Sequence, residues 1–514
     1  MNEGGTIGST AAVLADIKKP ALSSWRFRLI PRFESYPAVV SFVATPAGKL
    51  TNIAIFSAGL YLHRMNWWAE ATVLFLGLSF FPQYRRALVL AGTMYWLFMG
   101  YWRSARFAEF FSSGPTDGSK IHMAWWAICA AALLFCVGYY KASNAIEERW
   151  ANYRPLTGLL CVYFGMLVIA WYLSLEGIDR ALLWGFLFLL GKYIWFLAYA
   201  LADRKAAATP AIWWHLGYFH PFWGSTSTPF PKGAAYLRKV EAKSDRDLAI
   251  CQIKATKLLY WVGGLIILKQ IFVAFVPSLG SRRSIPKLDT ILPQYDYFGI
   301  PNMTNAFEQS MNGTPYPFYL GIFALIAFFL YTTLKLAIWG HIFIAMCRMA
   351  GFNALRNTYN PLGSATIAEF WNRYYYYFKE LLVDMFFYPA FLRYFKKKPK
   401  LRMFFATMSA AFFGNCIYHY LRESNRIFEA GPYQTLMEFR YYILYAFILA
   451  SGIGISQFIN EGKPRVRSSL NGRIISPVRV CSFYCLLSIL WYQGNFEITF
   501  MDRINFALSL VGVG

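Results

Sequence analysis

Long apolar runs constrain this chain more than any other feature of its sequence. Several are close to the roughly 20 residues that a helix needs to cross a bilayer, and lipid admits only helices and closed barrels as spanning structures. The runs therefore predict an all-α polytopic membrane protein with about 11–12 transmembrane helices. They lie near residues 37–63, 67–83, 87–102, 122–140, 157–175, 181–202, 257–277, 317–347, 401–421, 437–458, 477–493 and 497–513.

The charged residues support a membrane protein and argue against a nucleic-acid-binding protein. Of the 514 residues, 57% are hydrophobic and only 15% are charged, although the formal net charge is +24. The Lys and Arg residues cluster in short segments between apolar runs, where they set topology and contact anionic headgroups. No basic surface is interleaved with a soluble nucleic-acid fold. We therefore expect membrane lipids, and no nucleic acid, as partners.

Loops rich in Lys and Arg predict the orientation of the chain. The segment 393–402 holds six basic residues and no acidic residue, and 461–479 holds five basic residues and one acidic residue. By contrast, 278–316 holds three of each sign. The positive-inside rule places 204–256, 393–402 and 461–479 in the cytoplasm, and 278–316 and 422–436 on the opposite side.

The same patterns predict two units of unequal size. Residues 1–36 are polar and then mixed, with aromatic and cationic side chains together near their end, which is typical of a segment at the headgroup boundary. Residues 37–514 are predicted to form a single membrane-embedded domain around a central tunnel. Within it, 204–256 is a basic cytoplasmic loop, 366–392 is a re-entrant or interfacial helix pair, and 340–423 is the catalytic core.

One histidine stands out in the apolar run 403–421. This run has no charged residue, and its one titratable base is His419. An ionisable side chain at membrane depth is costly and is by default a functional candidate; the alternative is a histidine hydrogen-bonded between helices. Asn415 and Glu423 lie four residues before and after it, on the same helical face, so that either could fix the imidazole tautomer. The competing explanation is that Glu423 only caps the helix end and forms an ion pair, with no role in orienting His419.

The segment 366–392 is too polar for ordinary lipid-facing helix. Such a segment is tolerated at membrane depth only where protein covers it or a water-filled cavity borders it, so it is a candidate tunnel wall. The alternative is a cytoplasmic amphipathic helix with tyrosines at headgroup level. Its charged residues are Glu369, Arg373, Lys379, Glu380 and Asp384, and a block of four phenols runs from Tyr374 to Tyr377.

The residues on either side of this segment complete an ordered pattern. In chain order it consists of Arg348, Gly351-Phe352, Asn360-Pro361, Glu369-Phe370-Trp371-Asn372-Arg373-Tyr374-Tyr375, Asp384, Pro389 and the run from Phe413-Gly414 to His419. The pattern resembles the central part of the membrane-bound O-acyltransferases, especially the bacterial branch with the alginate O-acetylation protein and the D-alanyl transfer protein of teichoic acid modification. One position departs from it: Tyr375 stands where the bacterial pattern has a histidine.

The resemblance implies acyl transfer from a thioester to a hydroxyl inside a membrane tunnel. No tightly bound cofactor or metal is implied; the donor would be an acyl-CoA or an acyl carrier protein. The acceptor would be a glycan, a lipid or a small metabolite, and the location a bacterial plasma membrane. The implied catalytic residues are His419 as general base, with Asn372, Tyr375 and Asn415 as candidate oxyanion partners. The implied substrate-binding residues are Trp371, Arg373, Asn360, Asp384 and Tyr418.

Four further interpretations stay open on the sequence. His215 and His220 could bind a metal, but their spacing of five places them on different helix faces and no third ligand is evident. The basic residues around them, including Arg238, Lys239 and Lys243, could instead receive an acidic donor. A transporter or flippase with His419 on its path is the first rival function. An inactive acylation scaffold is the second, and Tyr375 is its best argument.

Overall fold

The chain is almost wholly helical. The computed structural model describes residues 30–100, 118–150, 153–204, 212–219, 221–225, 228–276, 279, 298–460, 474–493 and 497–513. Within these residues there is no strand, only one isolated antiparallel bridge between Glu241 and Phe352. Most of the predicted segment 1–36, with its aromatic and cationic cluster, lies outside the described residues. The prediction of an all-α polytopic fold is confirmed.

The helices of the first half precede and follow the basic loop. They are α2 (Pro37–Ala44), α3 (Pro46–Leu62), α4 (Trp68–Phe80), α5 (Arg85–Met99), α7 (Gly118–Arg149), α8 (Pro155–Tyr172), α9 (Gly177–Asp203), α10 (Ile212–Tyr218), α11 (Ala234–Val240) and α12 (Asp245–Phe275).

The helices of the second half contain the predicted catalytic core. They are α14 (Met303–Met311), α15 (Phe318–Met349), α16 (Ile367–Tyr374), α17 (Tyr376–Leu382), α18 (Tyr388–Arg393), α19 (Pro399–Met408), α20 (Asn415–Tyr420), α21 (Ser424–Glu438), α22 (Arg440–Asn460), α23 (Ser476–Trp491) and α24 (Phe500–Ser509). Two π-helical segments, η7 (Val383–Phe387) and η8 (Ser409–Gly414), join α17 to α18 and α19 to α20.

In the described part of the chain, six helices are long and apolar enough to cross a membrane: α7, α8, α9, α12, α15 and α22. The pair α2 and α3 would make a seventh span, but it is bent by 97°. The other predicted spans are shorter or interrupted. Helix α4 has 13 residues, α23 has 16 and α24 has 10, and the run 401–421 is divided by η8. Apolar runs continue through such turns and breaks, so their length overstates helix length.

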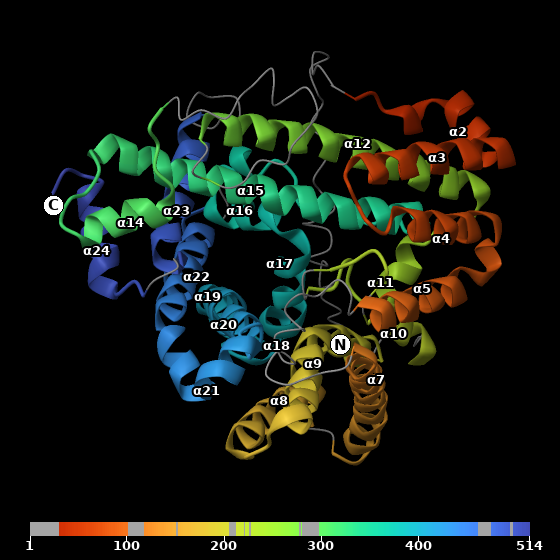
Figure 1. Ribbon diagram of the computed structural model, residues 1–514, viewed down its shortest axis with the longest axis horizontal. Helices are drawn as coiled ribbons and strands as arrows, with labels where there is room; N and C mark the ends of the chain where they lie inside the picture. Colours follow the sequence, from red (N-terminus) through yellow and green to blue (C-terminus); the bar gives the residue numbers. More distant parts are fainter. Residues whose placement is uncertain are drawn as a thin grey trace, which may run out of the picture.

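The long helices α12 and α15 lie side by side and form the spine of the molecule (Figure 1). Helices α3 and α4 cover one end of this spine, and α23 packs near the other. Helices α7, α8 and α9 form a second group, in which α9 contacts both neighbours. Helix α9 is buried along most of its length, whereas α8 exposes apolar side chains such as Val168 and Ile169. This contrast marks α9 as the interior helix and α8 as a lipid-facing helix.

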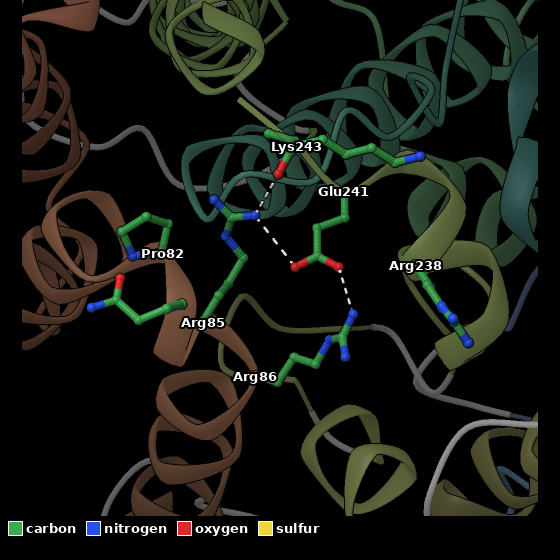
Figure 2. A pocket seen from close by; sticks show the side chains of 8 residues that line it. Pro82, Arg85, Arg86, Arg238, Glu241 and Lys243 are labelled. Carbon is green, nitrogen blue, oxygen red and sulfur yellow. Dashed lines mark hydrogen bonds and ion pairs between the residues drawn. The ribbon is translucent and has the colours of Figure 1, made fainter. Parts of the chain in front are cut away.

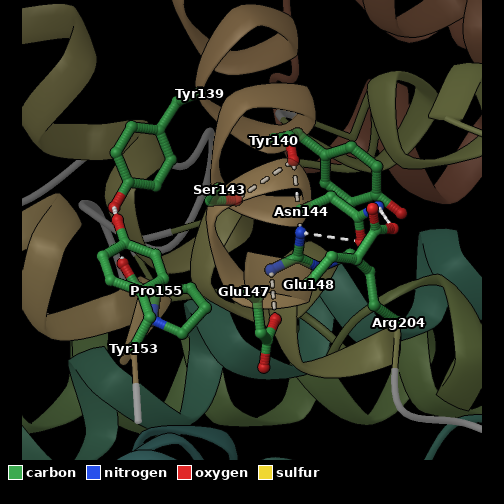
Figure 3. A network of polar contacts seen from close by, with 9 residues as sticks. All are labelled: Tyr139, Tyr140, Ser143, Asn144, Glu147, Glu148, Tyr153, Pro155 and Arg204. Atoms are coloured by element: carbon green, nitrogen blue, oxygen red, sulfur yellow. Dashed lines mark hydrogen bonds and ion pairs between the residues drawn. The ribbon is translucent and has the colours of Figure 1, made fainter. Parts of the chain in front are cut away.

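A polar network fixes the end of α9 against α7 (Figure 3). The Arg204 guanidinium donates to the Tyr140 carbonyl at 3.2 Å and to Asn144 Oδ1 at 3.3 Å, and it pairs with Glu147 at 3.1 Å. The Arg204 side chain is only 7% exposed, so these contacts replace most of its hydration. Next to them, the Tyr139 hydroxyl donates to the Pro155 carbonyl at 2.7 Å and ties α7 to the start of α8.

Replacing Arg204 with methionine is expected to destabilise the pairing of α7 with α9. The change removes hydrogen bonds from a charged donor, each of which contributes about 1.5–3 kcal/mol net of the hydrogen bonds to water that it replaces. The measurement is the thermal unfolding midpoint in a neutral detergent. Lys141→Met is the matched control, since Lys141 is exposed on the same helix α7. Equal midpoints for the two variants would contradict the prediction.

Candidate active site

Two π-helical segments meet at the centre of the predicted catalytic core. A Cβ added to Gly414 of η8 would lie 2.6 Å from the ring of Phe386 in η7, so glycine alone permits this approach. The Ser409 hydroxyl donates to the Phe386 carbonyl at 3.4 Å. Single π-helical turns are rare and often occur at functional sites. The two segments position α17, which precedes η7, and α20, which follows η8.

His419 lies on α20 inside a wall of aromatic rings. Its imidazole centroid is 4.7 Å from the ring of Tyr442, 5.0 Å from that of Tyr418 and 5.7 Å from that of Phe378. The residue keeps part of its surface exposed. The imidazole makes no hydrogen bond within the described part of the chain, so neither Asn415 nor Glu423 orients it directly. Ring packing instead holds the imidazole, and its nitrogens stay available to a substrate.

Asn415 lies one turn before His419 and is fully buried. Its Oδ1 accepts a hydrogen bond from the Tyr442 hydroxyl at 3.1 Å, so Tyr442 contacts both residues. The Asn415 Nδ2 is buried and has no hydrogen-bond partner among the described residues. An unpaired buried N–H costs about 1–3 kcal/mol, so it calls for an explanation. Asn415 thus presents a buried donor one turn from an available imidazole.

A chain of hydroxyls links Tyr375 to the neighbour of His419. The Tyr375 hydroxyl donates to Thr228 Oγ1 at 3.3 Å, and Thr228 Oγ1 shares a hydrogen bond of 2.6 Å with the Tyr418 hydroxyl. Thr228 and Tyr418 are buried. Tyr375 therefore lies within reach of the His419 wall, although it replaces the histidine of the bacterial pattern. Thr228 was not predicted, because its loop is nearly 200 residues away in sequence and reaches this site only through tertiary contacts.

Arg422 is a second residue that the sequence did not indicate. Its guanidinium carbon lies 5.9 Å from the ring centroid of Tyr418, in a cation–π contact. Arg422 forms no ion pair with the described carboxylates, and the residue is exposed. The site therefore carries a positive charge beside the tyrosine that adjoins His419. The only sequence signal for it is its position directly after the apolar run 403–421.

The predicted residues of α16 divide between the site and its surroundings. Trp371 packs edge-on against Phe378 at 5.8 Å, and Phe378 in turn contacts His419, so Trp371 supports the aromatic wall. Asn372 is exposed and makes no hydrogen bond within the described residues. The structure thus brings Trp371 close to the wall and leaves Asn372 outside its packed part.

Arg373 and Asn360 form a separate clasp. Arg373 pairs with Glu369 at 2.6 Å and donates to the Asn360 carbonyl at 3.3 Å and to the Gly363 carbonyl at 3.4 Å. Asn360 has a φ of 47°, in the left-handed region that asparagine tolerates better than most residues. These contacts fix the loop before α16. They explain both residues by the local fold without a substrate.

Asp384 belongs to a charge network at the start of η7. Lys232 pairs with Asp384 at 2.8 Å and with Glu380 at 2.5 Å, and the Tyr199 hydroxyl of α9 donates to Asp384 at 3.1 Å. The three charged side chains are 17–25% exposed, so the network is largely removed from water. Lys232 lies four residues after Thr228. The network therefore anchors the loop that carries Thr228 to the helices that carry the aromatic wall.

Only one of the two histidines of the basic loop lies in the described part of the chain. His215 is buried on α10, with its ring 5.7 Å from that of Tyr140, and His220 lies outside the described residues. No group of three or more His, Cys, Asp or Glu side chains among the described residues could hold a metal ion.

The packed part of the site thus combines His419, Asn415, Tyr375, Tyr418 and Trp371 from the predicted set. Asp384 lies in the anchoring network, while Arg373 and Asn360 form the clasp.

Comparison with known proteins identifies no relative: no family model matches the sequence, and no curated protein matches it.

Proposed function

We propose that this protein is a membrane-embedded O-acyltransferase that moves an acyl group from a thioester donor to a hydroxyl. The observation that carries the proposal is the pairing of an available imidazole, His419, with the unpartnered buried amide of Asn415 one helical turn away. The sequence resemblance to bacterial membrane-bound O-acyltransferases supports the same chemistry and a bacterial plasma membrane. The donor would be an acyl-CoA or an acyl carrier protein, and the acceptor a glycan, a lipid or a small metabolite.

The proposed reaction is direct transfer in a ternary complex. The acceptor oxygen attacks the thioester carbonyl carbon while His419 takes the hydroxyl proton as general base. The carbonyl oxygen becomes negative in the tetrahedral intermediate, and Asn415 Nδ2 would donate a hydrogen bond to it. As the intermediate collapses, the C–S bond breaks and the imidazolium returns its proton to the leaving thiolate. No covalent acyl-enzyme is formed.

In this proposal the other residues of the site would have supporting roles. Tyr442 contacts both His419 and Asn415, so its ring and its hydroxyl fix their relative position. Tyr375, Thr228 and Tyr418 form a hydrogen-bonded wall beside the base. Positioning of both substrates against such a preorganised site supplies much of the rate in reactions of this type.

The proposal is tested with purified protein in vesicles and acyl-CoA thioesters of graded chain length, with cytoplasmic-side access confirmed by protease protection. We expect time-dependent release of free CoA, measured by chromatography, that rises when a hydroxyl acceptor is supplied. Labelled substrate that crosses the vesicle membrane without CoA release or acylated product would favour a transporter or flippase. Unchanged thioester with every acceptor class tested would favour the inactive scaffold.

Replacing Asn415 with leucine is expected to lower acyl transfer by about 10²- to 10³-fold, because one donor to a developing oxyanion is lost. The side chains have similar volume, but the change removes the acceptor of the Tyr442 hydroxyl as well as the buried unsatisfied N–H, so the thermal midpoint should fall about as much as in Tyr442→Phe, which breaks the same hydrogen bond. Tyr442→Phe is the matched control. It removes only the hydroxyl that donates a hydrogen bond to Asn415 Oδ1 and leaves the Asn415 Nδ2 donor in place. An Asn415→Leu variant with parental turnover would remove Asn415 from the mechanism.

A further inference from the structure

A basic cavity lies away from the His419 wall, between the start of α5 and the end of α11. Its volume is about 590 Å³, within the range of small-ligand sites. We call it the arginine pocket; it is lined by Pro82, Gln83, Arg85, Arg86, Arg238, Glu241, Ala242 and Lys243. Four of these side chains are cationic and one is anionic, so the pocket carries an excess of positive charge (Figure 2).

Glu241 is shared between two of the arginines. Arg85 contacts one carboxylate oxygen at 3.3 Å and Arg86 contacts the other at 3.2 Å. Arg85 also donates to the Ala242 carbonyl at 2.9 Å. Figure 2 shows Arg85 and Arg86 converging on this carboxylate, whereas the side chains of Lys243 and Arg238 extend away from it. One carboxylate thus serves two guanidinium groups, and the side chains that line the pocket carry more positive than negative charge.

Arg85 and Arg86 also occupy an unfavourable place on their helix. They are the first two residues of α5, and the first turn of this helix contains no acidic residue. The N-terminal end of a helix carries a partial positive charge, so cations there are destabilising unless an anion is bound. Arg85 is only 3% exposed, and its Nε is buried without a hydrogen-bond partner among the described residues. The one carboxylate of the lining, Glu241, is therefore shared by two cations at this helix end.

The surroundings hold these guanidinium groups in place. Arg86 stacks on Trp214 at 3.7 Å, and Arg238 lies 5.9 Å from the same ring. Stacking fixes the plane of a guanidinium while its N–H groups point outward at its edge, which suits recognition of phosphate oxygens. Under Arg85 lies Gly351, with a φ of +94°, and a Cβ there would come within 2.9 Å of the guanidinium. The glycine of the sequence pattern therefore makes room for a pocket arginine.

We propose that the arginine pocket binds a phosphate-bearing group of diphosphate size. Phosphate oxygens match the edge donors of several guanidinium groups, and two phosphates would balance the excess charge that Glu241 leaves. The cavity has space for more than a single inorganic phosphate. The group could belong to a soluble nucleotide-type molecule such as CoA or to an anionic lipid headgroup. This proposal is independent of the chemistry proposed at His419, because it concerns binding alone.

The test is calorimetric titration of the full chain with inorganic pyrophosphate, in nanodiscs of phosphatidylcholine alone. We expect saturable binding that weakens with added salt. The double variant Arg86→Gln with Lys243→Gln should weaken it by about tenfold or more for each lost cation. The control is Lys239→Gln with Arg246→Gln, which removes the same charge from exposed positions of the same loop outside the pocket; this variant should bind within about twofold of the parent.

Two further arms identify the source of the phosphate group. Competition by CoA would assign the pocket to a soluble ligand, and loss of pyrophosphate binding in nanodiscs that contain phosphatidic acid would assign it to a lipid headgroup. Equal weakening by both double variants would overturn the proposal, because the effect would then be one of overall charge. Absence of saturable pyrophosphate binding to the parent would overturn it as well. Should the double variant not fold, Lys243→Gln alone, at an exposed position of the pocket lining, should lower the affinity for pyrophosphate by about tenfold.

Discussion

Replacing His419 with glutamine is expected to lower acyl transfer by about 10²- to 10⁴-fold, the usual contribution of a general base. Glutamine fills similar space and can still form hydrogen bonds, but it cannot take a proton from the acceptor hydroxyl. The imidazole makes no hydrogen bond to the described residues, so the aromatic wall should keep its packing. The measurement is the turnover number for CoA release with a saturating hydroxyl acceptor.

The control for this substitution lies on the same short helix. Tyr420 donates its hydroxyl to the Pro432 carbonyl at 2.9 Å, away from the ring contacts of His419. Tyr420→Phe therefore perturbs α20 to a similar degree without touching the base, and we expect turnover close to that of the parent. If His419→Gln turned over as fast as Tyr420→Phe, His419 would be a structural residue and the mechanism would fail.

Replacing Lys232 with methionine is expected to give the largest loss of stability. The change removes the positive charge that pairs with the Glu380 and Asp384 carboxylates. Lys379 still contacts Glu380. Removing one partner from a buried ion pair costs about 3–5 kcal/mol, and the residual exposure of these side chains places the expected loss near the lower value. The thermal unfolding midpoint and the fraction of monodisperse protein measure it.

The charges can be removed together as a control. A triple variant, Lys232→Met with Glu380→Gln and Asp384→Asn, removes Lys232 together with both of its carboxylate partners. Lys379 then loses its contact with Glu380 but keeps the ring of Tyr376 at 4.8 Å, so much of the lost stability should be recovered. Lys239→Met, at an exposed position of the same loop, should leave the midpoint unchanged. A single Lys232→Met variant as stable as Lys239→Met would show that the network contributes little to folding.

The fold class could be predicted from the sequence because a long run of apolar residue types identifies a membrane-embedded segment, and such a segment must satisfy its own backbone hydrogen bonds. A run such as 317–347 has to be a buried helix, and α15 covers it almost completely. The number of spans did not follow, because apolar character does not mark where a helix turns. The 97° bend between α2 and α3 lies inside one apolar run, at Pro46, whose fixed φ suits the first turn of a new helix.

The site was predictable where residues are close in sequence and less so where they meet through the fold. The spacing of Asn415 and His419 by four residues correctly placed them one turn apart on α20. Glu423 was expected on the same face, but α20 ends at Tyr420 and Glu423 stands at the N-cap position of α21, where its side chain makes no capping hydrogen bond. Thr228 and Tyr442 come from distant elements, and no local pattern distinguishes them from other polar residues. The assignment of catalytic roles stays a prediction.

The two π-helical segments change which face of the helix the following residues occupy. A π-helical turn holds one more residue than an α-helical turn, so everything after it is rotated by about 100° relative to an uninterrupted helix. A helical wheel drawn through 401–421 therefore misplaces the positions that follow Gly414 by about 100°. The direction in which His419 points therefore depends on the extra residue in the π-helical segment 409–414. Deleting one residue from this segment would turn His419 to another face of the helix.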